Sequence, residues 1–237
     1  MNNNYPFDMP QFGGHDFALA NRVSTIMKNV YLRMSLGLLI TAVTALLAFN
    51  EGFVSFMIQH SWIYWGLFIA EFGIVIGVSA GISKMKASSA AALFYLFAII
   101  NGLALSMIFA AYSPGSIAKT FFITAGTFGA MSVFGYTTKQ DLTKFGSFLF
   151  MALIGLIIAS VVNIFWNNGT MGWIISFAGV IIFVGLTAWD TQQVKRMAEV
   201  MPAAAAGHIA TLGALSLYLD FINLFLYLLR FFGSSRD

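Results

Sequence analysis

Long apolar runs, separated by short polar turns, dominate the pattern of hydrophobic and polar positions along this chain. A helix needs roughly 20 apolar residues to cross the hydrocarbon core of a bilayer. The pattern predicts such spans at Tyr31–Phe49, Ser61–Ile82, Ser88–Tyr112, Ile117–Tyr136, Phe145–Trp166, Met171–Trp189 and Ile209–Phe232. The connections between these runs are too short to hold a soluble domain. We therefore predict an all-α membrane protein with seven transmembrane helices.

The composition supports this class. Of the 237 residues, 59% are hydrophobic and only 9% are charged, whereas a soluble domain has about 25% charged residues. The chain has no cysteine, which excludes disulfides and thiolate chemistry. Its net charge of +3 does not indicate a nucleic-acid partner, because the cations lie in the connections between spans.

The position of the cations predicts the orientation. Lysine and arginine lie before the first span and after the second, fourth and sixth spans, and are absent from the other three connections. Cytoplasmic loops are enriched in these residues, so we expect a cytoplasmic N-terminus and an external C-terminus, although Arg230 and Arg236 disagree with the latter. We divide the chain into a flexible cytoplasmic segment (1–29), the transmembrane domain (30–233) and a short tail (234–237).

Three acids stand in or beside apolar sequence: Glu71, Asp190 and Asp220. An ionised carboxylate at the bilayer centre costs about 3 kcal/mol, and such residues usually face the bundle interior and mark ion or proton paths. Asp190 lies at the cytoplasmic end of the predicted sixth span. Asp220 lies roughly 16 Å into the seventh, at 1.5 Å per residue. This offset in depth permits a contact between the two aspartates but does not require one.

If the two aspartates meet, both cannot ionise cheaply, so they would share a proton. Losing that proton would drive the helices apart or admit a cation, which makes a pH-dependent gate. The alternative for Asp220 is a structural hydrogen bond to another helix, and for Asp190 an ordinary helix end. Polar residues that could line a pore or seam beside this pair are Glu71, Ser216, Asn223 and Thr187.

Three motifs carry a family resemblance. The segments GLTAWDTQQVKRM (185–197), ALSLYLDFINLFLYLLRFFG (214–233) and TTKQDL (137–142) resemble the Bax inhibitor-1 family, also called the transmembrane Bax-inhibitor-motif family, in its bacterial branch. The resemblance extends over all seven spans. It implies a bundle whose last helix is surrounded by the other six, with Asp190 and Asp220 in contact as the pH sensor.

The resemblance also implies a function, a pH-sensitive calcium leak across the bacterial inner membrane. Calcium and protons would then be the partners besides the lipid bilayer, with no cofactor and no enzymatic activity. Calcium takes six to eight oxygen ligands, so two aspartates predict weak, transient binding. In some relatives a basic residue after span two latches onto the span-six aspartate. This chain has no arginine there, and Lys84 and Lys86 are the candidates.

Three other functions stay open. Some bacterial relatives modulate a membrane-bound ATP-dependent protease, and the segment Met1–His15 could serve such a partner as a handle. A proton-coupled transporter would use Glu71 and Asp220 as proton carriers. An intramembrane aspartyl protease is disfavoured, because no glycines frame Asp220.

Overall fold

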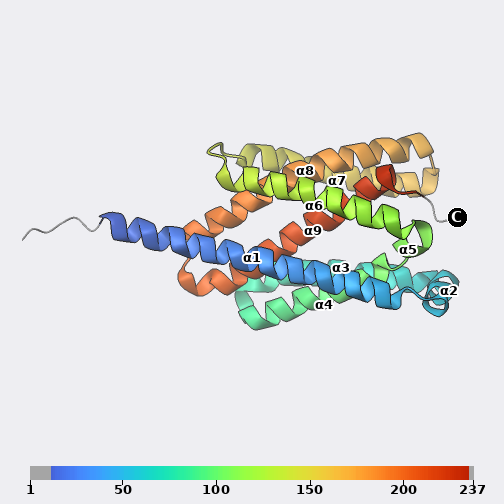
Figure 1. Ribbon diagram of the computed structural model, residues 1–237, viewed down its shortest axis with the longest axis horizontal. Helices are drawn as coiled ribbons and strands as arrows, with labels where there is room; N and C mark the ends of the chain where they lie inside the picture. Colours follow the sequence, from blue (N-terminus) through green and yellow to red (C-terminus); the bar gives the residue numbers. More distant parts are fainter. Residues whose placement is uncertain (1–11, 235–237) are drawn as a thin grey trace, which may run out of the picture.

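The chain folds almost entirely into helices. The computed structural model describes residues 12–234, and this part contains no β-strand. The helices are α1 (Phe12–Ala48), α2 (Glu51–Gln59), α3 (Ser61–Gly81), α4 (Ala87–Leu105), α5 (Ile108–Ala111), α6 (Pro114–Thr137), α7 (Thr143–Trp166), α8 (Gly169–Val200) and α9 (Ala206–Phe232), with 3-10 turns η1 (Ile82–Lys84) and η2 (Ala203–Ala205). Figure 1 shows them as an elongated bundle from which the N-terminal end of α1 projects.

Seven of the helical segments are long and apolar enough to cross a membrane, which confirms the predicted fold class. Most predicted boundaries agree within a few residues. Two helices are longer than expected, because polar turns at their ends remain helical. The first span begins at Phe17 instead of Tyr31, and the sixth continues to Val200 instead of Trp189. Helix α2 was not predicted.

The domain boundary expected at residue 29 falls inside α1, which begins at Phe12. The division into three parts and the flexibility of the first part stay predictions. Residues 1–11 of the proposed protease handle lie outside the described residues.

Short polar sequences set the turns between spans. In YSPGS, Ser113 caps α6 by accepting a hydrogen bond from the Ser116 amide, and Pro114 occupies the first helical position, where a missing N–H costs nothing. In NNGT, Asn167 ends α7 in the left-handed conformation with φ 46°, which asparagine tolerates better than most residues. Asn168 then caps α8.

Helix α9 lies in the interior of the bundle. In its most apolar window 67% of the residues are buried, whereas the corresponding fraction is 6% for the span that contains α3. Helix α9 is therefore surrounded mainly by protein, and α3 lies at the periphery of the bundle. It packs against α8, α1, α6, α4 and α3. Small residues permit close packing: Gly213 of α9 lies against Val194 and Val30, and Gly179 of α8 against the ring of Tyr227. Enclosure of the last helix by all six others stays a prediction.

Two arginines of α1 hold the connection between α8 and α9. Arg22 donates to the carbonyl oxygens of Ala198 and Glu199, both at 2.8 Å, and so satisfies carbonyls that the end of α8 leaves free. Arg33 donates to the Gly207 carbonyl at 3.0 Å and to the Thr211 hydroxyl. Helix α1 therefore fixes where α8 ends and where α9 begins, which sets the depth of the aspartates on both.

Candidate functional site: an acidic pair and a polar chain around α9

The length of α8 reduces the offset in depth that the sequence suggested, from roughly 16 Å to about 6 Å along the helix axes. Asp190 lies ten residues before the end of α8 at Val200, which is about 15 Å along the axis. Asp220 lies 14 residues after the start of α9 at Ala206, or about 21 Å. Because α8 and α9 are joined by a short connection at the same end of the bundle, the two aspartates lie at similar depths.

The structure brings Asp190 and Asp220 into contact. Their carboxyl groups lie within hydrogen-bonding reach of each other. Asp220 is only 4% exposed, and its Oδ2 has no hydrogen-bond donor among the described residues. Asp190 is half-buried. Two carboxylates in contact in a buried site repel each other strongly when both are ionised, so a proton held between them is the arrangement of lowest energy.

The polar residues expected beside this pair are mostly engaged elsewhere. The Thr187 hydroxyl donates to the Phe183 carbonyl at 2.7 Å, and the Asn223 amide nitrogen donates to the Leu219 carbonyl at 2.8 Å. Both bonds run back four residues along the side chain's own helix. Ser216 is half-buried on α9, one turn before Asp220.

Glu71 belongs to a different polar group, on the other side of α9. Its Oε1 accepts a hydrogen bond of 3.1 Å from the Asn101 amide nitrogen. The Asn101 amide oxygen accepts one of 2.9 Å from the Tyr218 hydroxyl, which lies 2.6 Å from the Thr41 hydroxyl. Thr41 in turn donates to the Ala98 carbonyl at 2.8 Å. This polar chain (Glu71, Asn101, Tyr218, Thr41) joins α3, α4, α9 and α1.

The number of protons in the polar chain is limited. Thr41 and Tyr218 have one hydroxyl proton each. When Asn101 turns its nitrogen toward Glu71, its oxygen takes the Tyr218 proton. If the amide were reversed, it would donate to Tyr218, Tyr218 would donate to Thr41, and Glu71 would need a proton of its own to bond the Asn101 oxygen. The direction of the hydrogen bonds is therefore coupled to whether Glu71 is ionised.

Sequence reasoning missed most of this chain. Asn101, Tyr218 and Thr41 are buried, and Glu71 is half-buried. A polar residue in an apolar span is a detectable signal, but only the packing shows which helices meet there. The Tyr218 ring is held edge-on by Phe94 and Phe97, with centroids 5.7 Å and 5.5 Å away.

The candidate latch residues stand away from the pair. Lys84, in η1, and Lys86, before α4, are both exposed. Among residues 12–234 the only ion pair joins Arg196 to Asp141, so neither lysine is paired with Asp190 in this conformation. A latch by these lysines stays a prediction.

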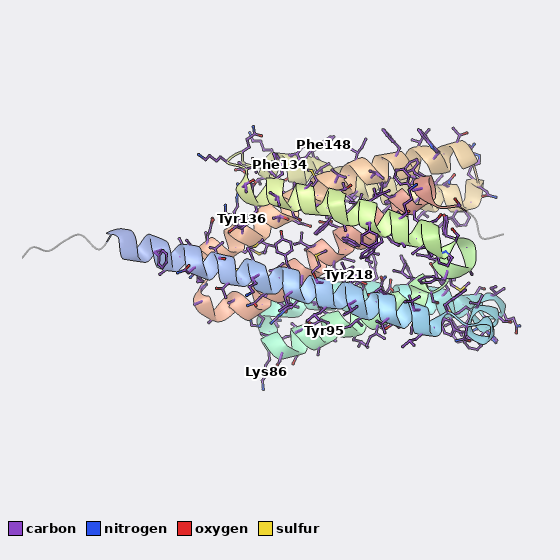
Figure 2. The ribbon with its side chains drawn as sticks, in the orientation of Figure 1. Lys86, Tyr95, Phe134, Tyr136, Phe148 and Tyr218 are labelled. Carbon is purple, nitrogen blue, oxygen red and sulfur yellow. The ribbon has the colours of Figure 1, made fainter. Side chains whose placement is uncertain are left out.

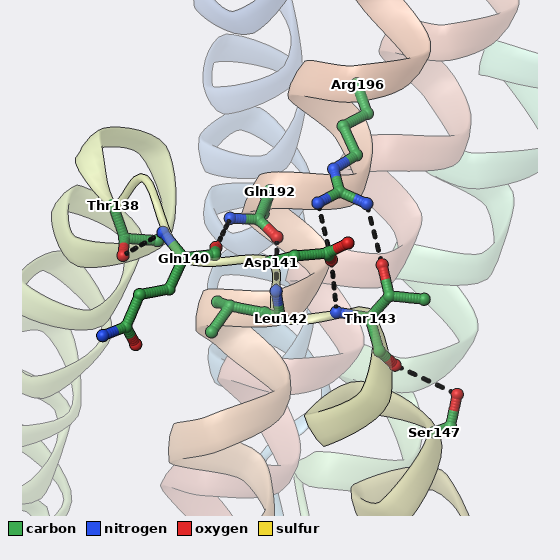
Figure 3. Close-up of polar contacts among 8 residues, drawn as sticks. All are labelled: Thr138, Gln140, Asp141, Leu142, Thr143, Ser147, Gln192 and Arg196. Atoms are coloured by element: carbon green, nitrogen blue, oxygen red, sulfur yellow. Dashed lines mark hydrogen bonds and ion pairs between the residues drawn. The ribbon is translucent and has the colours of Figure 1, made fainter.

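The end of α8 beyond Asp190 grips the α6–α7 connection, which carries the TTKQDL motif (Figure 3). Gln192 donates to the Gln140 carbonyl at 2.8 Å and accepts from the Leu142 amide at 2.9 Å. Arg196 donates to the Asp141 carboxylate at 2.6 Å and to the Thr143 hydroxyl at 2.7 Å. The loop is therefore bound to the helix that carries Asp190.

Asp141 is fully ionised in this clamp. Hydrogen bonds from the side chain and backbone of Thr143, and from Arg196, lower the pKa of Asp141 from 3.8 to about 2. The clamp thus keeps its charge throughout the neutral and mildly acidic range, unlike a carboxyl pair that shares a proton.

Known proteins with similar sequences include membrane proteins, in agreement with the long apolar helices of this chain. A family model described as inhibitor of apoptosis-promoting Bax1 matches residues 23–237. The chain is 48% identical over 218 residues to inner membrane protein YbhL of Escherichia coli (strain K12), covering 90% of this chain and 93% of that protein. It is 44% identical over 220 residues to a protein of Borreliella burgdorferi, covering 90% and 95%. A membrane protein of Streptococcus pyogenes is 38% identical over 187 residues, covering 79% and 81%.

The family match, from residue 23 to residue 237, includes both aspartate motifs and reaches all seven spans, and the described helices have the length and apolarity that a membrane requires. The membership that the three motifs predicted is thereby confirmed: the chain belongs to the Bax inhibitor-1 family, as a multi-pass membrane protein.

Proposed function

We propose that this protein is a pH-sensitive calcium leak channel whose gate is the Asp190–Asp220 pair. The observation that carries the proposal is the contact of two carboxyl groups between α8 and α9, inside a bundle of mainly apolar helices. A buried acid costs several kcal/mol unless it is paired or protonated. The charge of such a carboxyl pair, and with it the attraction or repulsion between α8 and α9, therefore depends on pH.

In the closed state a shared proton joins the two carboxyls and holds α8 against α9. When the proton leaves, the two negative charges repel each other, and the helices separate or a cation takes the proton's place. Helix α8 carries the clamped α6–α7 loop with it, because Gln192 bonds both ends of that loop's turn. Opening would therefore move the loop and α8 as one unit.

Calcium fits this site as a passing ion. Two aspartates supply at most four carboxylate oxygens, whereas calcium prefers six to eight ligands, so water must complete the shell. Weak binding suits permeation, because an ion must leave a channel site as readily as it enters. Asn223 keeps its amide oxygen available near Asp220, since only its nitrogen is engaged.

We further propose that the protein lies in the bacterial inner membrane, as the name of YbhL states for that relative, with its N-terminus in the cytoplasm. The cations of the α6–α7 loop and of the α8 end, which include Lys139, Lys144 and Arg196, gather at one end of the bundle. This asymmetry supports the orientation. Partnership with an ATP-dependent protease stays a prediction.

The test is calcium flux into liposomes that contain the purified protein and a trapped fluorescent indicator. We expect flux that varies with pH and that rises in proportion to calcium, as in a channel. Flux that requires an organic substrate and saturates with it would favour the transporter instead. Absence of flux at every pH would remove the channel and leave the regulatory role as the best remaining candidate.

A further inference from the structure

An open groove runs between α1 and α6, away from the acidic pair. Its volume is about 540 Å³, and its walls include Met27 and Lys28 of α1 and Phe128, Gly129 and Ser132 of α6. The walls are mainly apolar. Helix α1 packs chiefly on α4 and α9, and α6 on α8 and α9, which leaves the space between α1 and α6 unfilled.

The groove opens toward the surroundings of the bundle. Figure 2 shows α1 and α6 apart on this face, with Tyr136 between them. Tyr136 lines the groove near the end of α6. An apolar side chain lies at the opening: Val133 of α6 lines the groove and is 63% exposed. In a membrane, the molecules that reach such an opening are lipids.

Inside the groove, Ser132 presents an unused hydrogen-bond donor. The residue is only 5% exposed, and its Oγ has no hydrogen-bond partner among the described residues. Neighbouring hydroxyls on α6 are satisfied by their own helix, as Thr127 donates to Ile123 and Thr137 to Val133. A buried polar group without a partner is unfavourable, so an acceptor that enters the groove and bonds this hydroxyl is stabilised there.

One end of the groove carries positive charge. Lys28 lies in its wall and is exposed. Lys195 lies 4.9 Å over the Tyr136 ring and donates to the Tyr136 carbonyl. Among residues 12–234, no acid lines the groove. An anion is therefore favoured at this end, and an apolar chain along the rest.

The distance in depth between the positively charged end of the groove and the Ser132 hydroxyl is similar to the distance between the phosphate and the ester carbonyls of a phospholipid. Ser132 lies one helical turn, about 6 Å, from the level of Tyr136. The interfacial layer on each side of a bilayer is roughly 5–7 Å thick, so a phosphate beside Lys28 would place its ester carbonyls near the Ser132 hydroxyl. We propose that this groove binds one anionic phospholipid, with its phosphate at Lys28, an ester carbonyl at Ser132 and an acyl chain against Met27 and Phe128.

Two glycines of α6 offer a matched pair of variants. An added Cβ at Gly129 or at Gly126 would have no atom of another element within 4 Å, but only Gly129 lines the groove. Gly129→Phe would place a ring at the wall of the groove, while Gly126→Phe, one turn away, makes the same chemical change outside it.

The experiment is photocrosslinking of the purified protein in vesicles with a phosphatidylglycerol that carries a diazirine on its acyl chain, followed by mass spectrometry of the labelled peptides. We expect labels concentrated on Met27, Phe128 and Val133, lost in Gly129→Phe and kept in Gly126→Phe. Lys28→Gln should lower the preference for phosphatidylglycerol over phosphatidylcholine about fivefold, whereas Lys119→Gln, at the other end of α6, should not.

Ser132→Ala tests the hydroxyl without changing the volume of the groove. The wild type should bind the ester lipid better than an ether-linked analogue, which has no carbonyl, and Ser132→Ala should abolish this difference. Labels spread evenly over the lipid-facing surface, or labelling of the groove that survives Gly129→Phe, would overturn the proposal. If both glycine variants lose the label, the ester and ether comparison decides.

Discussion

Tyr218 and Asp220 lie two residues apart on α9, and their side chains leave the helix on opposite sides. A separation of two residues is a rotation of about 200°. Tyr218 joins the polar chain on α1 and α4, while Asp220 meets Asp190 of α8. One turn of α9 therefore connects the two polar groups at nearly the same depth. A shift of α9 that alters the contacts of one group would also alter the contacts of the other.

Replacing Tyr218 by phenylalanine should break the polar chain while the ring keeps its edge-on contacts with Phe94 and Phe97. The Asn101 oxygen would lose its donor inside the bundle. We expect the free energy of unfolding to fall by about 1–3 kcal/mol, measured by denaturation of the protein in detergent. Tyr95→Phe is the control, because no hydrogen bond of the Tyr95 hydroxyl is present among the described residues. Equal stability of the two variants would contradict the role of the chain.

Close packing of α6 on α8 should make Gly135→Ala destabilising. An added Cβ would clash with the backbone of Ala188, at its carbonyl oxygen, and neither helix backbone can easily move aside. Overpacking of this kind costs about 1–3 kcal/mol, whereas alanine in place of an exposed helical glycine usually stabilises by up to about 1 kcal/mol.

The matched control is Gly126→Ala on the same helix, where nothing lies within 4 Å. Thermal unfolding in detergent should therefore shift in opposite directions for the two variants. A Gly135→Ala protein as stable as the wild type would mean that α6 and α8 are farther apart than in this structure.

The number and approximate positions of the membrane-spanning helices could be predicted from the sequence. The reason is that backbone N–H and C=O groups in the bilayer must be hydrogen-bonded within the protein, and a long apolar helix achieves this. The ends of the helices could not. The run from Thr191 to Val200 is polar and reads as a loop, yet α8 continues through it. The reason is that Gln192 and Arg196 bond the α6–α7 connection and Lys195 donates to the Tyr136 carbonyl at the end of α6, a tertiary stabilisation that no local pattern reveals.

The candidate site, too, could be predicted only in part from the sequence. Asp190 and Asp220 were found from their cost in an apolar setting and from the family motifs, and they do meet. Glu71 was grouped with them on the same reasoning, but it lies on the other side of α9 beside Asn101. Which face of a buried helix a polar residue occupies depends on packing, and α9 is buried on nearly every side.

Loss of Gln192 should loosen the α6–α7 loop. Its side chain satisfies the Leu142 amide and donates to the Gln140 carbonyl, so Gln192→Ala leaves both without that partner. We expect faster hydrogen exchange at residues 138–143 and a loss of about 1–3 kcal/mol of unfolding free energy. Gln59→Ala serves as the control, because Gln59 is exposed in α2 and bonds only Ser55. Unchanged exchange in the loop would show that Gln192 does not hold it.

The Asp141 clamp should contribute nothing to pH sensing in the neutral range. Since the pKa of Asp141 is lowered from 3.8 to about 2, its stabilising effect is fully present above pH 3.8 and is lost only as the pH falls through about 2. Asp141→Asn should therefore leave the shape of the flux curve against pH unchanged, although the loop is held less firmly. A flattened curve in this variant would place part of the sensor in the clamp.

The central claim is tested most directly by calcium flux in liposomes, scanned from about pH 5 to about pH 8, with the wild type beside Asp190→Asn and Asp220→Asn. One titrating proton can change the ratio of open to closed states by up to about tenfold per pH unit. We predict that the wild-type flux follows pH with such a dependence and that each substitution flattens it, because an amide cannot release a proton. A wild-type pH profile that survives in both variants would contradict the proposed gate.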